Sequence, residues 1–265
     1  MIIHSKYSSK ISDSFDAFND IVFEDVFSIG CDCTTAITMI RMGLRKYSGP
    51  LDWVRGGTFR ARMELLINGF KKYLDYNLIS VKSSEDEHIV FNTLNNIEFV
   101  HDFSDISEFE SVFKSVKIKY LRRINRFYSR LKSSKNLLLI YTSKFTLINS
   151  FEIAELHAKL IEKFGNNIYL IVIENDINQF NIKTEKINDK ILKYTLNLKT
   201  LDENGRPLIF KRMFLFDTIF DSLKVKGKFI RKWKRKILRP LTNIIPFSNM
   251  RTAVRKFLNI NNTNF

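Results

Sequence analysis

Two runs of consecutive apolar residues constrain the fold of this 265-residue chain more than any other feature. They are Leu137–Tyr141 and Ile168–Ile173, and residues 149–164 between them carry apolar side chains at helical spacing. A strand that is apolar throughout has to be covered on both faces of its sheet, and a strand–helix–strand connection joins parallel strands. We therefore predict an α/β fold, with a mainly parallel sheet flanked by helices, over residues 21–223.

The remaining elements follow from shorter patterns of the same kind. Further strands are expected at 21–29, within 78–100 and at 190–198, and further helices at 33–48, 58–76, 107–132 and 208–223. Residues 1–20 are polar and are expected to be irregular, and 224–265 are expected to form a basic amphipathic tail. With 45% hydrophobic residues, 9 Gly and 4 Pro, the chain is neither intrinsically disordered nor collagen-like.

Positive charge is concentrated at the C-terminal end. The whole chain has a formal net charge of +15, yet residues 222–265 hold twelve Lys and Arg and no Asp or Glu. The first 221 residues therefore carry 31 basic and 28 acidic side chains, a net charge of +3. A basic coat over the whole fold, as expected of a dedicated nucleic-acid-binding domain, is absent from the sequence.

The sequence shows no membrane-spanning segment and no signal peptide. The longest apolar runs are far shorter than the roughly 20 residues that a spanning helix needs. Residues 1–15 are polar and lack the apolar core of a signal peptide. We expect a cytoplasmic protein whose two cysteines, Cys31 and Cys33, stay reduced.

The segment from Ser28 to Cys33 predicts a strand, a tight turn at Gly30 and the start of a helix. A thiol at a helix N-terminus lies near the positive end of the helix dipole, which favours the nucleophilic thiolate. Free backbone N–H groups at the same place can bind an oxyanion. The alternative is that Cys33 is a small buried residue with a purely structural role. A metal site is not expected, because there is no second cysteine pair to complete it.

A nucleophilic thiol needs a base, and His101 is the best-placed histidine. It ends an apolar stretch and is followed at once by Asp102. Reacting groups of α/β enzymes lie at the ends of strands. The alternative is a strand end followed by a turn-forming aspartate.

Four short motifs now carry a resemblance. In chain order they are Ser28-Ile29-Gly30 followed by Cys33, Arg41-Met42-Gly43-Leu44-Arg45, Gly49-Pro50-Leu51-Asp52-Trp53 and His101-Asp102-Phe103. The stretch Tyr120-Leu121-Arg122-Arg123-Ile124-Asn125-Arg126-Phe127 follows them. This order resembles a family of bacterial proteins described as papain-like cysteine peptidases, over about residues 21–175. Leu51 stands where that family usually has an aromatic residue, and Cys31 is an unusual neighbour.

The resemblance implies that Cys33 is the nucleophile and His101 its base, with either Asp102 or Asp52 orienting the imidazole. It also implies a role in surface-polysaccharide assembly, such as capsule or lipopolysaccharide. Ser28 and Gly30 are assigned to substrate binding. Three arginines of the later stretch are candidates for binding a phosphate or an acidic sugar, although such a run is commonly a solvated face: Arg122, Arg123 and Arg126.

The basic tail predicts a cationic amphipathic helix that ends at Pro240. Apolar residues recur at helical steps among nine basic residues in 224–239. This composition is typical of a helix that lies on an anionic membrane surface. The residues assigned to that contact are Lys228, Arg231, Lys232, Trp233 and Arg235. Nucleic acid is a less favoured partner, and a solvated extension without a partner is the third reading.

We expect a cytoplasmic enzyme, peripheral on the inner membrane face, that uses Cys33 and His101 for hydrolysis or acyl transfer without a cofactor or metal. Its substrate would be a sugar, a lipid-linked glycan or an acyl compound. One alternative is a glycosyltransferase of the same pathway with a structural Cys33. The other is a non-enzymatic, membrane-associated binding protein.

Overall fold

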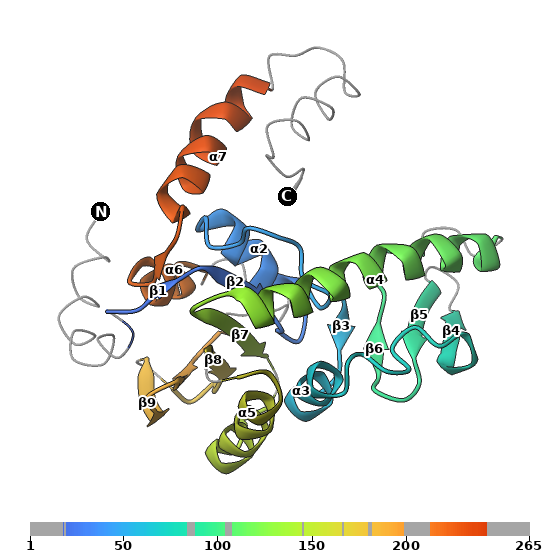
Figure 1. Ribbon diagram of the computed structural model, residues 1–265, viewed down its shortest axis with the longest axis horizontal. Helices are drawn as coiled ribbons and strands as arrows, with labels where there is room; N and C mark the ends of the chain where they lie inside the picture. Colours follow the sequence, from blue (N-terminus) through green and yellow to red (C-terminus); the bar gives the residue numbers. More distant parts are fainter. Residues whose placement is uncertain are drawn as a thin grey trace.

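The computed structural model describes Phe18 and residues 20–83, 88–103, 108–144, 146–165, 167–179, 182–198 and 213–242. Most of the N-terminal segment that we expected to be irregular therefore lies outside the described residues, as do tail residues 243–265. The described residues form a mixed α/β fold with one five-stranded sheet, one four-stranded sheet and a two-stranded pair (Figure 1).

The five-stranded sheet has the order β2-β7-β8-β10-β9. Its strands are β2 (Asp25–Ser28), β7 (Leu137–Ser143), β8 (Ile168–Asn175), β10 (Ile191–Leu196) and β9 (Lys183–Asn188). The first four are parallel, and β9 is an antiparallel edge strand. The strand–helix–strand prediction is confirmed, with α5 (Ser150–Phe164) joining β7 to β8. The pattern did not predict β9, because its sequence is largely polar.

The second sheet is antiparallel throughout, so a mainly parallel arrangement holds only for the central sheet. Its order is β3-β6-β5-β4. The strands are β3 (Arg55–Gly56), β6 (Ile97–Glu98), β5 (His88–Asn92) and β4 (Ile79–Ser83), which follows a short 3₁₀ turn, η2 (Tyr76–Leu78). Strands β4, β5 and β6 confirm the strands expected within 78–100, whereas β3 was not predicted.

Helices cover both faces of the central sheet, and successive residues of β7 alternate between the two cores. Leu137 and Leu139 belong to one cluster of buried residues, while Leu138 and Ile140 belong to the other. The first core includes residues of α3, α4 and α5, and the second includes residues of α2 and α6. The bounds not yet given are α2 (Cys33–Arg41), α3 (Phe59–Ile67), α4 (Phe109–Ser133) and α6 (Met213–Asp221).

Two helices end earlier than expected. We expected helices to about residues 48 and 76, whereas α2 ends at Arg41 and α3 at Ile67. Each is followed by a glycine in the left-handed region, Gly43 with φ +71° and Gly69 with φ +74°. This backbone conformation cannot continue a right-handed helix.

The C-terminal segment starts as part of the body. Strand β11 (Lys224–Val225) pairs in parallel with β1 (Val22–Phe23), and α7 (Lys228–Thr242) then projects away from the sheets (Figure 1). The helix continues past Pro240, where we had expected it to stop. Within the described residues, no helix is both long and apolar enough to cross a lipid bilayer.

Candidate functional site

The turn that carries both cysteines connects β2 to α2 beside the end of β7. The backbone N–H of Cys31 donates to Thr142 O (3.0 Å), and α2 begins at Cys33. Asp32 caps this helix by accepting a hydrogen bond from the backbone N–H of Thr34 (2.9 Å). Gly30 is required here, because a Cβ at this position would lie 2.2 Å from Thr35 Oγ1. The predicted strand, turn and helix start are confirmed.

A buried arginine that the sequence analysis did not single out holds the turn in place. Arg62 of α3 is fully buried, and its guanidinium donates to the carbonyl oxygens of Gly30, Cys31, Val54 and Gly56. Its Nη2–Cys31 O distance is 3.1 Å. Its position among apolar residues of α3 was the available signal, since a charged residue on a buried helix face needs a partner.

A cavity of about 550 Å³ opens beside this turn. Cys31 and Asp32 form part of its wall, and the β3 segment, the start of α3, residues 94–98 and the end of β7 with the residues after it supply the rest. Cys33 is not among the lining residues. The charged residues around it are paired: Lys144 with Asp32, and Arg55 with Glu98. The full set of lining residues is Cys31, Asp32, Arg55, Gly56, Gly57, Thr58, Ala61, Leu94, Asn95, Asn96, Glu98, Tyr141, Ser143, Lys144 and Thr146.

Both thiols are partly buried, and their electrostatics differ from the expectation. Burial and the neighbouring Asp32 carboxylate raise the pKa of Cys31 and of Cys33 above the usual thiol value. Lys144 opposes this shift at both thiols. The lowered pKa expected at the start of α2 is therefore not found, because burial and the Asp32 carboxylate raise the pKa of each thiol more than Lys144 lowers it.

His101 makes no described hydrogen bond with either of the two carboxylates that were expected to orient it. Its side chain is exposed, and its ring packs edge-on against Trp53 with 6.1 Å between centroids. Asp102 instead accepts a hydrogen bond from Tyr120 Oη (2.6 Å) and pairs with Lys119. Among the contacts described for 88–103 and their neighbours, none is a hydrogen bond from His101 to Cys33, Asp52 or Asp102.

Asp52 belongs to a buried cluster of arginines instead. Its Oδ2 accepts from the Gly49 N–H (2.8 Å) and lies 3.2 Å from Nε of Arg45, whose side chain is 4% exposed. Burial raises the pKa of Asp52, and the Arg45 guanidinium opposes that change. Arg45 also lies over the Trp53 ring, 5.3 Å from its centroid. Trp53 therefore has Arg45 on one side and His101 on another.

Two arginines of α4 complete this cluster. Arg126 donates from Nη2 to Ser48 O (3.0 Å), and Arg123 lies over the Tyr120 ring at 5.2 Å. Buried guanidinium nitrogens without a hydrogen-bond acceptor occur on three of its members: Arg45 Nη1, Arg123 Nη1 and Arg126 Nε. The third arginine assigned to substrate binding, Arg122, is exposed, and it lies outside these contacts.

The other two residues assigned to substrate binding are buried in the cysteine turn. Ser28 is 1% exposed, and its Oγ accepts the Gly30 N–H at 3.3 Å. The carbonyl of Gly30 accepts a hydrogen bond from Arg62. In this structure both residues therefore contact protein groups and shape the turn that positions Cys31 and Cys33.

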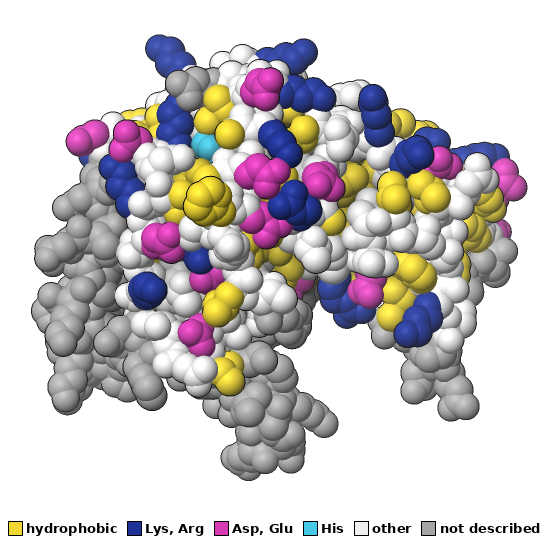
Figure 2. Space-filling view, turned by 90° about the horizontal axis from the view of Figure 1, so that it is seen from below, with side chains coloured by type: hydrophobic (Ala, Val, Ile, Leu, Met, Phe, Trp, Pro, Cys, Tyr) yellow, Lys and Arg dark blue, Asp and Glu magenta, His cyan; other side chains and the backbone are white. Residues whose placement is uncertain are grey.

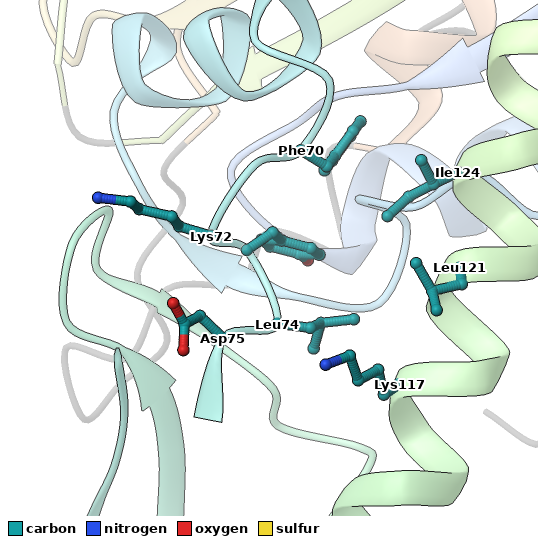
Figure 3. A pocket seen from close by; sticks show the side chains of 8 residues that line it. Phe70, Lys72, Leu74, Asp75, Lys117, Leu121 and Ile124 are labelled. Atoms are coloured by element: carbon teal, nitrogen blue, oxygen red, sulfur yellow. The ribbon is translucent and has the colours of Figure 1, made fainter. Parts of the chain in front are cut away.

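A smaller groove of about 330 Å³ lies between α4 and the turn after α3. In Figure 3, Lys117, Leu121 and Ile124 of α4 face Leu74 across this groove. It contains neither cysteine nor any other residue predicted for the site. The cavity beside Cys31 is therefore the better candidate for substrate binding.

One face of the molecule shows how the two signs of charge are distributed over the surface. On the face seen in Figure 2, basic and acidic side chains are interspersed rather than segregated. Among the described residues, no group of three or more His, Cys, Asp or Glu is placed to hold a metal ion.

Comparison with known proteins places these features in a family. The chain is 28% identical over 183 residues to an uncharacterized protein of Acanthamoeba polyphaga mimivirus, covering 61% of this chain and 81% of the viral protein. No solved structure matches the chain significantly. A family profile described as "Putative papain-like cysteine peptidase" matches residues 24–175, more than half of the chain and the region that contains every motif of the cysteine turn and the arginine cluster. The chain belongs to this papain-like cysteine peptidase family.

Proposed function

We propose that this protein is a cysteine-dependent hydrolase with Cys33 as its nucleophile. The observation that carries the proposal is the cysteine turn, held by Arg62. It places Cys33 at the start of α2, two residues after Cys31, which lines a cavity of about 550 Å³. The positive charges of Lys144 and Arg55 favour the thiolate of Cys33, and they oppose the rise in its pKa that burial causes. Membership of the family supports the same chemistry.

The reaction needs the thiol proton to leave before or during attack, because burial keeps Cys33 protonated in the resting protein. We assign the proton to His101. His101 follows Glu98, which lines the cavity, by three residues in the chain. The Cα atoms of His101 and Glu98 therefore lie within about 11 Å of each other. Catalytic hydrogen bonds often tighten only when substrate is bound, and the exposed ring is able to move.

In the proposed reaction, Sγ of Cys33 attacks the substrate carbonyl and transfers its proton to His101. Backbone N–H groups at the start of α2 bind the oxyanion. The leaving group takes the proton from the imidazole, and a thioester remains on Cys33. Water then attacks the thioester, releases the acid and restores the thiol.

A mass-spectrometric experiment tests this assignment. The intact protein is mixed with p-nitrophenyl acetate, and the acetylated residue is mapped by peptide sequencing. We expect the label on Cys33, with the label lost in Cys33→Ser, retained in Cys31→Ser and acquired more slowly in His101→Gln. Equal labelling of Cys31 and Cys33, at the rate of a small free thiol, would contradict the proposal and favour a structural Cys33 with a glycosyltransferase function.

Acyl transfer in polysaccharide assembly is the finer form of this proposal. The same thioester would then react with a sugar hydroxyl instead of water. Adding a monosaccharide to the acetylated protein distinguishes the two: an acetyl sugar would indicate transfer, and acetate alone would indicate hydrolysis.

We also propose that the substrate carries an anionic group bound near Arg123 and Arg126. The support is the ratio of three guanidinium groups to the single Asp52 carboxylate. Buried nitrogens of all three arginines lack an acceptor, and Asp52 Oδ1 in the same cluster lacks a donor. Inorganic phosphate is expected to raise the melting temperature of the protein and to do so less in Arg126→Met. Arg122→Met serves as the control, because Arg122 is exposed and lies outside the cluster. Phosphate is expected to raise the melting temperature of this variant as much as that of the unmodified protein. No shift in the unmodified protein would exclude the anion site.

A further inference from the structure

Helix α7 attaches to the body through its cationic side. Lys228 Nζ donates to the carbonyl oxygens of Phe220, Asp221 and Leu223, between 2.7 and 3.1 Å. Arg231 Nε donates to Gly43 O at 2.8 Å. The fit is close, because a Cβ at Gly43 would lie 2.6 Å from Lys228 O. Two of the residues predicted to bind a membrane, Lys228 and Arg231, therefore hold the helix to the protein.

The apolar side of α7 faces away from the body. Four large apolar residues recur at helical steps and are strongly exposed: Phe229 at 79%, Ile230 at 58%, Trp233 at 49% and Ile237 at 40%. An amphipathic helix of a globular protein normally packs its apolar stripe on the core and turns its charges to water. In α7 this arrangement is reversed, and a contiguous apolar stripe is left without cover from the described residues.

Lysines border the stripe on both sides. At 3.6 residues per turn, Lys234 and Lys236 lie about 80° to either side of its centre. Both are exposed, and residues 222–265 contain no Asp or Glu. An apolar stripe between two rows of cations matches the boundary between acyl chains and anionic headgroups.

We propose that α7 lies on an anionic lipid bilayer, with Phe229, Ile230, Trp233 and Ile237 inserted at the headgroup boundary and Lys234 and Lys236 against lipid phosphates. The occupant follows from the charge and the stripe together. A second copy of this chain would bring two acid-free cationic segments together. RNA would contact the lysines and leave the apolar stripe in water. An anionic bilayer satisfies both features of the helix.

Co-sedimentation of the full chain with lipid vesicles tests the proposal. We expect binding to vesicles containing phosphatidylserine, weaker binding in high salt, and little binding to pure phosphatidylcholine. Trp233 reports insertion in a Trp53→Phe background, since these are the two tryptophans of the chain. Its emission is expected to shift to shorter wavelength on anionic vesicles only.

Matched variants distinguish binding through α7 from non-specific binding of the protein to vesicles. Lys234→Glu with Lys236→Glu is expected to weaken vesicle binding about 30-fold or more, at roughly a fivefold loss for each lysine removed. Lys114→Glu with Lys117→Glu, on exposed positions of α4, is expected to change binding far less. Phe229→Ser is expected to weaken binding, whereas Phe151→Ser, at a residue 88% exposed on α5, is not.

Four outcomes would overturn the proposal. The first is failure of the unmodified protein to bind anionic vesicles. The second is vesicle binding that the α7 variants leave unchanged. The third is a dimer in light scattering that Phe229→Ser dissociates, which would make the stripe an interface between two copies. Duplex RNA that binds more tightly than anionic vesicles, with no change in Trp233 emission, would also count against the bilayer.

Discussion

Two buried arginines near the candidate site are accommodated in opposite ways. Arg62 donates to four different backbone carbonyl oxygens and needs no carboxylate. Arg45 pairs with the Asp52 carboxylate, donates to Tyr47 O at 3.1 Å and keeps Nη1 without an acceptor. A guanidinium stays charged in any protein environment, so each solution has to compensate a full positive charge.

The difference indicates what each region is built to do. Carbonyl groups from the cysteine turn and the 54–56 segment surround Arg62, so its charge locks backbone into one conformation. The Arg45 cluster holds three guanidinium groups and one carboxylate, so an anion from outside would balance its charge. We read Arg62 as scaffold for the nucleophile and propose the Arg45 cluster as an anion site. The first two of four predictions test that division.

The largest effect is expected for Arg62→Met. Removing the guanidinium leaves four buried carbonyl oxygens without their donor, and we expect a loss of about 3–5 kcal/mol in unfolding free energy. Urea denaturation followed by circular dichroism measures it. Arg62→Lys is the control, and it should recover little stability because an ammonium lacks the planar fork. A loss of unfolding free energy below about 1 kcal/mol in Arg62→Met would show that Arg62 does not hold the cysteine turn in place.

Asp52→Asn is expected to cost less, about 2–3 kcal/mol, because it unpairs a cluster that is partly open to solvent. Combining it with Arg45→Met removes the unpaired charge. We expect this double variant to unfold at a higher urea concentration than Asp52→Asn alone. Strictly additive losses in the double-mutant cycle would show that Asp52 does not stabilise Arg45.

Asp32→Asn is expected to alter reactivity rather than stability. The Asp32 carboxylate raises the pKa of both thiols and pairs with Lys144. Its removal should lower both pKa values, so iodoacetamide should react several-fold faster at pH 7.5. Asparagine still caps α2, so the unfolding free energy should change by less than about 0.5 kcal/mol. A slower reaction would mean that Asp32 acts as a base for the thiols.

The smallest expected effect is the pH dependence of the unfolding free energy that comes from the buried His157 imidazole. His157 Nε2 lies 3.0 Å from Ile168 O, and burial lowers the pKa of His157 below its usual 6.5. The unfolded chain therefore binds the proton more readily, and unfolding free energy should fall as pH drops below about 6.5. The slope is at most about 1.4 kcal/mol per pH unit for one proton. In His157→Gln the stability curve should be flatter over this range, and an equally steep curve would contradict the assignment.

Much of the fold was predictable because the apolar pattern of central strands is local. The runs at β7 and β8 and the helical spacing of α5 are visible in the sequence, and so are the short strands of the second sheet. The edge strand β9 was missed, since it is largely polar and its pairing with β10 is a tertiary contact. The ends of α2 and α3 were misplaced, since left-handed glycines, and not the apolar period, terminate them.

The candidate site was also predictable from the sequence only in part. The sequence predicted that Cys33 starts a helix, because strand, glycine and helix signals occur in one short segment. It did not predict the partners of Asp52, Asp102 and His101. Asp102 contacts Tyr120 of α4, whereas the partners of Asp52 are Arg45 and Gly49, which are close to it in the chain. Neither pairing follows from an apolar pattern, because each depends on the path that the backbone takes between the two residues.

By itself, the sequence determined the central parallel strands, the position of Cys33 and the concentration of cations near the C-terminus, because each depends on residues close together along the chain. Only the tertiary structure decided that Arg62 holds the cysteine turn, that burial raises the pKa of both thiols, and that Lys228 and Arg231 of α7 bind the body while its apolar stripe faces outward between Lys234 and Lys236. Each of these depends on desolvation and on partners brought together by folding, which no local pattern records.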